Sequence, residues 1–189
     1  MIIIIFVVLF GGIYAVSMNF VAENQKFTIQ KEVNYPIDKV FPQFNNLQNF
    51  VRWNSVFGEN NPKIFQFFTP YEGKGSAMSF KDKKDSNFFG EIFIRYSNPG
   101  RTLKYQLFEG EERTPYLMDV KFIPSGEKTK IIWYINTPKQ TLLKRSLNLI
   151  SEDFWEDNIA KSVKKLELIL ANKIDKDNQR ETIKYDSLF

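Results

Sequence analysis

Residues 116–135 read YLMDVKFIPSGEKTKIIWYI and alternate apolar with polar side chains on both sides of a turn. The turn is the tripeptide Pro124-Ser125-Gly126, and proline and glycine are typical of a chain reversal between strands. A period of two indicates a β-strand with one buried face. The predicted inward faces consist of Tyr116, Met118, Val120 and Phe122 before the turn and Thr129, Ile131, Trp133 and Ile135 after it. This stretch therefore predicts two consecutive antiparallel strands that bury the same side of a sheet.

The same alternation extends upstream to residue 64, with turn signals at Gly73-Lys74-Gly75 and Asn98-Pro99-Gly100. We expect about six short strands in succession between residues 64 and 136. Residues 27–35 predict one earlier strand, and two small helices are expected between this strand and the meander. Pro36 suits the first turn of the first helix, because its missing N–H has no partner there in any case.

After Pro138 the apolar spacing becomes helical. One apolar stripe lies within residues 142–150 and a longer one within residues 154–170, and Ser151 is a candidate cap between them. One sheet face and one helix stripe must cover each other, so the predicted fold class is α+β. We expect a curved antiparallel sheet of about seven strands around a long C-terminal helix.

The chain contains no cysteine and no histidine. Disulfides, thiolate zinc sites, serine-histidine triads and imidazole metal sites are therefore excluded. No catalytic residue, metal site or cofactor is predicted. The formal net charge of +4 is spread over mixed acidic and basic positions, which argues against nucleic-acid binding. The densest basic group, Lys161, Lys164 and Lys165, has the spacing of one solvated helix face.

Residues 1–22 contain no charged side chain, and a helix of this length can cross a bilayer. This segment predicts a retained membrane anchor. A cleaved signal peptide is the alternative, with Ala15-Val16-Ser17 as the cleavage site, but the segment is long and has no basic start. The nearest positive side chains, Lys26, Lys31 and Lys39, follow the segment and favour a cytoplasmic domain, with the secreted or periplasmic side as the alternative.

Three regions follow from these patterns: an anchor over 1–22, a folded domain over 26–171 and a charged C-terminal tail over 172–189. The tail loses the helical apolar period and is expected to fray. We expect a single-pass membrane protein with a monomeric domain.

Several segments together resemble the START-like superfamily, also called SRPBCC or Bet v 1-like, in its polyketide cyclase and dehydrase-like branch. They are residues 27–41, Trp53, the YEGKGSAMSF motif at 71–80, Gly90, the Asn98-Pro99-Gly100 turn and Leu166-Glu167 in the closing helix. The resemblance covers about residues 26–170 and implies a helix-grip fold, in which a curved sheet wraps the last helix around an apolar cavity. The sequence departs from the family pattern at the first aromatic position near the second helix, where Phe50 stands before Trp53. Members of the superfamily include lipid carriers, aromatic polyketide cyclases, hormone receptors and chaperone co-activators.

Phenylalanine is unusually abundant, with 19 residues, and tyrosine and tryptophan add 8 and 3. Such rings either pack a solid core or line a pocket for a hydrophobic guest. On the second reading, the candidate ligand-binding residues are Trp53, Phe65, Phe67, Met78, Phe80, Ile94, Tyr105, Tyr116, Met118, Trp133 and Phe154.

Three polar features have competing readings. Lys31 lies in the inward phase of the first strand and is either a polar group inside the cavity or a rim lysine whose ammonium reaches water. The acids Glu109, Glu111 and Glu112 beside Arg113 form either an acidic site or, as we favour, a solvated loop. Gly73 and Gly75 indicate a hairpin turn, because no Walker spacing follows them.

The leading hypothesis is a membrane-anchored protein that binds a hydrophobic small molecule or lipid without catalysis. One alternative is a cyclase or dehydrase acting on an aromatic or polyketide-type substrate through Tyr, Asp or Glu. Another is a protein-interaction module whose cavity is closed.

Overall fold

The computed structural model describes residues 11–12, 24–57, 63–84, 88–111, 114–139 and 152–186, and the side chains of its last helix as far as Asn172. Most of the predicted anchor therefore lies outside the described residues, as do the apolar stripe at 142–150 and the candidate cap Ser151. Among the helices that are described, none has the length and apolar character needed to cross a bilayer.

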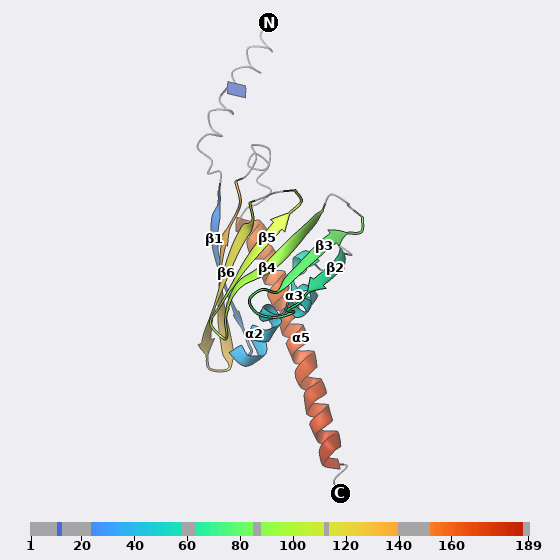
Figure 1. The fold of residues 1–189 in the computed structure, drawn as a ribbon. Helices are drawn as coiled ribbons and strands as arrows, with labels where there is room; N and C mark the ends of the chain where they lie inside the picture. Colours follow the sequence, from blue (N-terminus) through green and yellow to red (C-terminus); the bar gives the residue numbers. More distant parts are fainter. Residues whose placement is uncertain are drawn as a thin grey trace.

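Seven strands form one antiparallel sheet in the order β1-β7-β6-β5-β4-β3-β2 (Figure 1). The strands are β1 (Lys26–Val33), β2 (Lys63–Phe68), β3 (Ala77–Asp82), β4 (Phe89–Asn98), β5 (Thr102–Glu109), β6 (Tyr116–Ser125) and β7 (Lys128–Asn136). From β2 to β7 each strand pairs with the next one in sequence, and β1 closes the order by pairing with β7. This arrangement confirms the meander that the alternating sequence predicts.

Two short helices follow β1, namely α2 (Ile37–Asn45) and α3 (Leu47–Trp53), and a 3-10 turn, η1 (Ser55–Phe57), comes next. Pro36 is the N-cap of α2, one position before the predicted place. Asn46 ends α2 and caps α3, because its Oδ1 accepts hydrogen bonds from the N–H groups of Gln48 at 2.9 Å and Asn49 at 3.2 Å.

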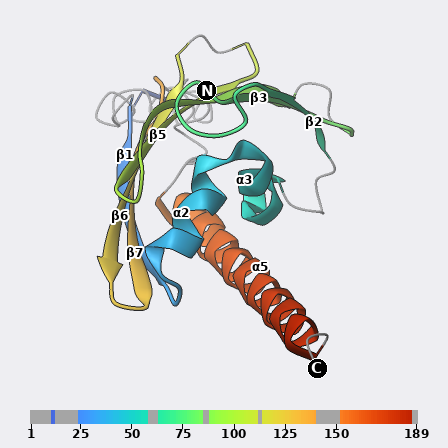
Figure 2. The same ribbon diagram turned by 60° about the horizontal axis from the view of Figure 1, so that its bottom comes forward.

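The last helix, α5 (Glu152–Asp186), lies with α2 and α3 on the concave side of the curved sheet (Figure 2). Two polar side chains of α5 bind the backbone of earlier segments. Ser162 Oγ accepts a hydrogen bond from the N–H of Ser55 in η1 at 2.9 Å, and Glu167 accepts one from the N–H of Asn34, just after β1, at 3.0 Å. The helix continues to Asp186, so residues 172–186 are helical rather than frayed. The apolar stripe ends earlier, and this distal part extends away from the sheet (Figure 1).

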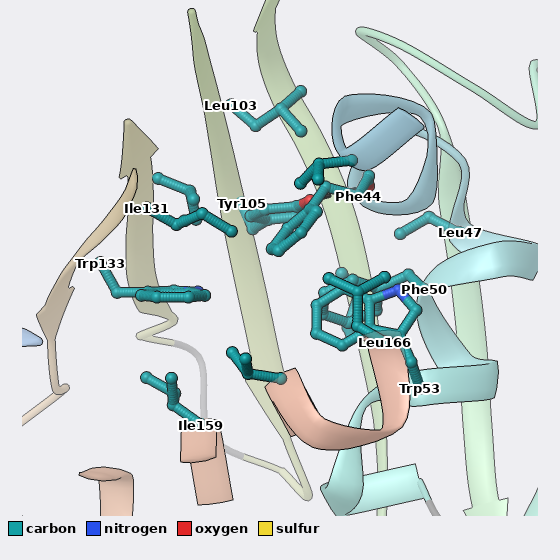
Figure 3. Packing of buried hydrophobic residues seen from close by; sticks show 14 of the residues in the cluster. Phe44, Leu47, Phe50, Trp53, Leu103, Tyr105, Ile131, Trp133, Ile159 and Leu166 are labelled. Carbon is teal, nitrogen blue, oxygen red and sulfur yellow. Dashed lines mark hydrogen bonds between the residues drawn. The ribbon is translucent and has the colours of Figure 1, made fainter. Parts of the chain in front are cut away.

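The core consists of aromatic and aliphatic side chains from the sheet, α2, α3 and α5 (Figure 3). The rings of Phe44 and Trp53 have centroids 4.4 Å apart, and the Trp53 indole N–H donates to the Gln43 carbonyl at 3.0 Å. Tyr105 lies among these rings and donates its hydroxyl to the Phe44 carbonyl at 2.7 Å. The two short helices are therefore joined to the sheet by buried hydrogen bonds as well as by packing.

One end of the sheet is the place where the chain enters it, and we call it the entry end. The strand pairing collects the following residue pairs there: Lys26 with Asn136, Tyr116 with Leu107, Glu109 with Gly90, and Asp82 with Lys63. The start of α5 lies at the same end, whereas its C-terminal part points the opposite way (Figure 1). The hairpin turn at Gly126 marks the opposite end of the sheet.

Candidate functional site

A cavity of about 310 Å³ lies between the concave face of the sheet and the helices. Its walls come from α3, η1, four strands or their flanks, and the first turn of α5. The lining residues are Phe50, Asn54, Val56, Phe57, Phe80, Phe88, Ile92, Tyr105, Leu107, Glu109, Tyr116, Met118, Phe154 and Trp155. The volume falls at the lower end of the range of small-molecule sites, which is about 300–1,000 Å³.

The cavity wall is mostly apolar, with a few polar groups. The Tyr105 hydroxyl is engaged with the Phe44 carbonyl, and burial raises the pKa of Tyr105 well above its ordinary value. Glu109 is half-buried and, among the described residues, has no ion-pair partner. An apolar enclosure with few polar groups is typical of sites for hydrophobic ligands.

The cavity opens at the entry end of the domain. Phe154, in the first turn of α5, is 44% exposed, whereas Phe50 and Tyr105 on the inner wall are 4% and 2% exposed. Glu109 ends β5 at the same end of the sheet, opposite Gly90. The exposed Phe154 and the half-buried Glu109 thus mark a mouth where the chain enters the domain, and Phe50 and Tyr105 form part of the floor.

Of the eleven candidate residues from the sequence, five line the cavity: Phe80, Tyr105, Tyr116, Met118 and Phe154. Four others are packed into the core instead, namely Trp53, Met78, Ile94 and Trp133. The remaining two, Phe65 and Phe67, are half-buried on β2 and stack on each other with centroids 6.1 Å apart. Alternation identified the inward face, but it does not tell which part of that face a helix covers.

Nine lining residues were not among the candidates: Phe50, Asn54, Val56, Phe57, Phe88, Ile92, Leu107, Glu109 and Trp155. Ile92 and Leu107 carry the same alternation signal as their neighbours and could have been selected with them. Asn54, Val56 and Phe57 lie at the end of α3 and in η1, which have no regular apolar period. For Glu109 the sequence favours a solvated loop, whereas Glu109 is the last residue of β5 and lines the cavity.

Lys31 does not line the cavity. Its ammonium forms an ion pair with Glu156 of α5 at 2.8 Å, and its side chain is 27% exposed, as expected for a rim lysine. Glu112 and Arg113 of the acidic cluster lie outside the described residues. In the described part of the chain, no group of acidic side chains is placed to hold a metal ion.

Gly73 and Gly75 lie in the turn between β2 and β3 with φ angles of +75° and +94°. The Ser76 N–H donates to the Gly73 carbonyl at 3.2 Å, which closes the turn between β2 and β3, as predicted. The Gly75 N–H donates to the Ile94 carbonyl at 2.8 Å and so joins this turn to β4.

A buried lysine lies behind the cavity wall. The Lys63 side chain is fully buried, donates to the Val56 carbonyl at 3.0 Å and lies 3.8 Å from the Asp82 carboxylate. Its ammonium is also 4.9 Å from the centroid of the Phe88 ring, which lines the cavity. Burial lowers the pKa of Lys63, and the negative charge of Asp82 opposes this shift only in part.

The lowered pKa of Lys63 makes the stability of the domain depend on pH. The folded pKa lies below the ordinary value of 10.5, so in the window between the two the unfolded chain binds more protons at Lys63. The contribution of Lys63 to the free energy of unfolding must therefore rise with pH across that window. We expect the free energy of unfolding of the wild-type chain to increase relative to that of Lys63→Met as the pH rises toward 10.5, measured by urea unfolding. Lys128→Met, at an exposed ion pair with Glu32, is the control, and an equal pH slope in all three proteins contradicts the prediction.

Sequence comparison alone does not place the chain: no family model and no curated protein matches it. Solved structures do match. A Staphylococcus epidermidis protein solved by NMR has a TM-score of 0.57 and 14% identity, over 80% of this chain and 91% of that one. Ara h 8.0201 has a TM-score of 0.56 and 11% identity, over 79% and 99%.

The chain has a helix-grip fold. DynU16, a protein of the dynemicin biosynthetic locus, shares this fold with a TM-score of 0.53 and 13% identity. The match covers 75% of this chain and 47% of DynU16, so the present chain spans about half of that protein. At these identities the likeness extends to the helix-grip fold alone, and the cavity must be interpreted from its own residues.

Proposed function

We propose that this protein binds a hydrophobic small molecule or lipid in the helix-grip cavity, without catalysis, while residues 1–22 tether it to a membrane. The observation that carries the proposal is the cavity of about 310 Å³, which stays open beside a core filled by large rings. Burial of apolar surface contributes about 25 cal/mol per Å² of area removed from water. A hydrophobic molecule can therefore gain affinity here from apolar contact with the cavity wall alone.

The positions of the polar groups favour binding over chemistry. The Tyr105 hydroxyl already donates a hydrogen bond to the Phe44 carbonyl, and its raised pKa makes it a poor proton donor to a substrate. Glu109 lies at the mouth, away from the buried floor formed by Phe50 and Tyr105. These features suit a site that holds a guest by shape and apolar contact.

A second candidate function rests on Glu109 itself. A carboxylate on an apolar wall is the one described lining group with the character of a general base, as a cyclase or dehydrase acting on an aromatic substrate needs. Turnover of a recovered ligand that is lost in Glu109→Gln would favour this alternative over binding.

The test is native mass spectrometry of the full chain, released gently from its own membrane. We expect a bound small molecule at one copy per chain. Leu107→Trp, which adds a ring on the cavity wall, should lower its occupancy by an affinity factor of about ten or more, equivalent to about 1.4 kcal/mol. The matched control is Leu117→Trp, on the neighbouring strand, where the side chain is half-buried and does not line the cavity.

Two results would contradict the proposal. One is a wild-type chain that carries no small molecule, and the other is equal occupancy in the Leu107 and Leu117 variants. A co-purified protein in place of a small molecule would instead support the interaction-module alternative.

A further inference from the structure

We infer that the entry end of the domain lies against the lipid bilayer, so that the mouth of the cavity opens directly onto the membrane. This inference rests on the tether of the proposed function. It adds an orientation of the domain and a route for the ligand.

The first argument is the position of the chain ends. The uncharged segment 1–22 connects to β1, whose first residue, Lys26, pairs with Asn136 at the entry end. Only a few residues separate that segment from the sheet, and an extended chain spans at most about 3.3–3.6 Å per residue. A tether in the bilayer therefore holds the entry end near the surface. The charged distal part of α5 points the other way (Figure 1).

The second argument is the apolar side chains exposed at the same end. Ile64 is 58% exposed, Phe89 is 37% exposed and Phe154 is 44% exposed. Phe68 and Ile123 at the opposite end are 44% and 46% exposed, so these side chains allow the entry end to contact lipid, and the position of the tether selects that end. Lys81 pairs with both Ile64, the second residue of β2, and Phe89, the first residue of β4, so both side chains lie at the entry end. Apolar side chains at a membrane surface gain free energy by entering the boundary between headgroups and acyl chains.

The third argument is the position of the mouth. Glu109 and Phe154 mark the open side of the cavity at the entry end. A hydrophobic molecule dissolved in the bilayer is costly to transfer through water, because its apolar surface must be hydrated on the way. A mouth placed against the bilayer removes that step, so the ligand exchanges between acyl chains and the ring-lined wall.

The absence of native cysteine allows a direct test, since any introduced cysteine is a unique labelling site. The full chain is reconstituted in vesicles of phosphatidylcholine and phosphatidylglycerol, and an environment-sensitive fluorophore is attached at one position per variant. Ile64→Cys, Phe89→Cys and Glu111→Cys report on the entry end. Matched positions at the opposite end are Phe68→Cys on the same strand as Ile64, Ile123→Cys as a second exposed apolar site, and Glu127→Cys as a second exposed loop acid.

We expect spin-labelled lipid to quench the three entry-end labels several-fold more strongly than the three opposite-end labels. Equal quenching at both ends, or the reverse pattern, overturns the inference and leaves the tether and the cavity standing. Flotation of the same vesicles tests the tether separately: a chain that stays in the aqueous fraction overturns the tether of the proposed function and the orientation with it. Retention of the bound small molecule in mass spectrometry depends on neither result.

Discussion

Trp53→Ala is expected to lower the free energy of unfolding by about 3–5 kcal/mol, the range for a fully buried tryptophan replaced by alanine. Trp53 is 2% exposed, and its ring contacts those of Phe44 and Phe50 at centroid distances of 4.4 and 5.1 Å. The substitution leaves a void between α2 and α3 and removes the donor that pairs with the Gln43 carbonyl. Chemical unfolding followed by circular dichroism measures the loss.

Two comparison variants sharpen this test. Trp53→Phe keeps a ring and loses the indole N–H, so it should cost less than the alanine variant. Arg52→Ala, at the exposed neighbouring position on α3, should change stability little. If Trp53→Ala lowers the free energy of unfolding as little as Arg52→Ala, then Trp53 faces open space, which is the position on the cavity wall that the sequence predicts.

Gly90→Ala should cost about 1–3 kcal/mol or more through overpacking and should also weaken ligand binding. A Cβ at Gly90 would clash with the Phe108 carbonyl oxygen and would come within 2.7 Å of the Phe80 ring. The clash with this backbone oxygen can be relieved only by a shift of β4 relative to β5, and the Phe80 ring, which is part of the cavity wall, must move as well. Stability and small-molecule occupancy should therefore fall together.

Glu91→Ala, one residue along β4 and exposed, is the control for both measurements. A Gly90→Ala protein with wild-type stability and occupancy would mean that the sheet relaxes at this point, and the close approach of β4, β5 and Phe80 would have no energetic role.

Local patterning was sufficient for the strands, because most inward positions in the meander are apolar and most reversals contain proline or glycine; the charged connection between β3 and β4 contains neither. Tyr116, Trp133 and their alternating neighbours, together with the turn at Gly126, predicted β6 and β7 without reference to anything distant. The capping role of Asn46 is local in the same sense, since it involves the two N–H groups that follow within three residues.

The extent of the last helix was less predictable. The apolar stripe ends near Leu170, yet α5 continues to Asp186. A helix can propagate beyond its packed part once it is nucleated, because each further residue adds a hydrogen bond at small cost. Hydrophobic periodicity reports burial, so it marks the packed part of α5 and not its end.

The amino-acid order alone thus specified an antiparallel meander, two small helices and a closing helix, because these depend on the period of side chains within each segment. It did not separate the residues that fill the core from those that line the cavity: Tyr105 and Trp133 have the same inward phase, yet one borders the open space and the other is packed in the core. That division depends on how far α3 and α5 reach across the curved sheet. The same packing placed Glu109 on the cavity wall and Lys63 behind it, since contacts between segments distant in sequence leave no periodic signal in either one.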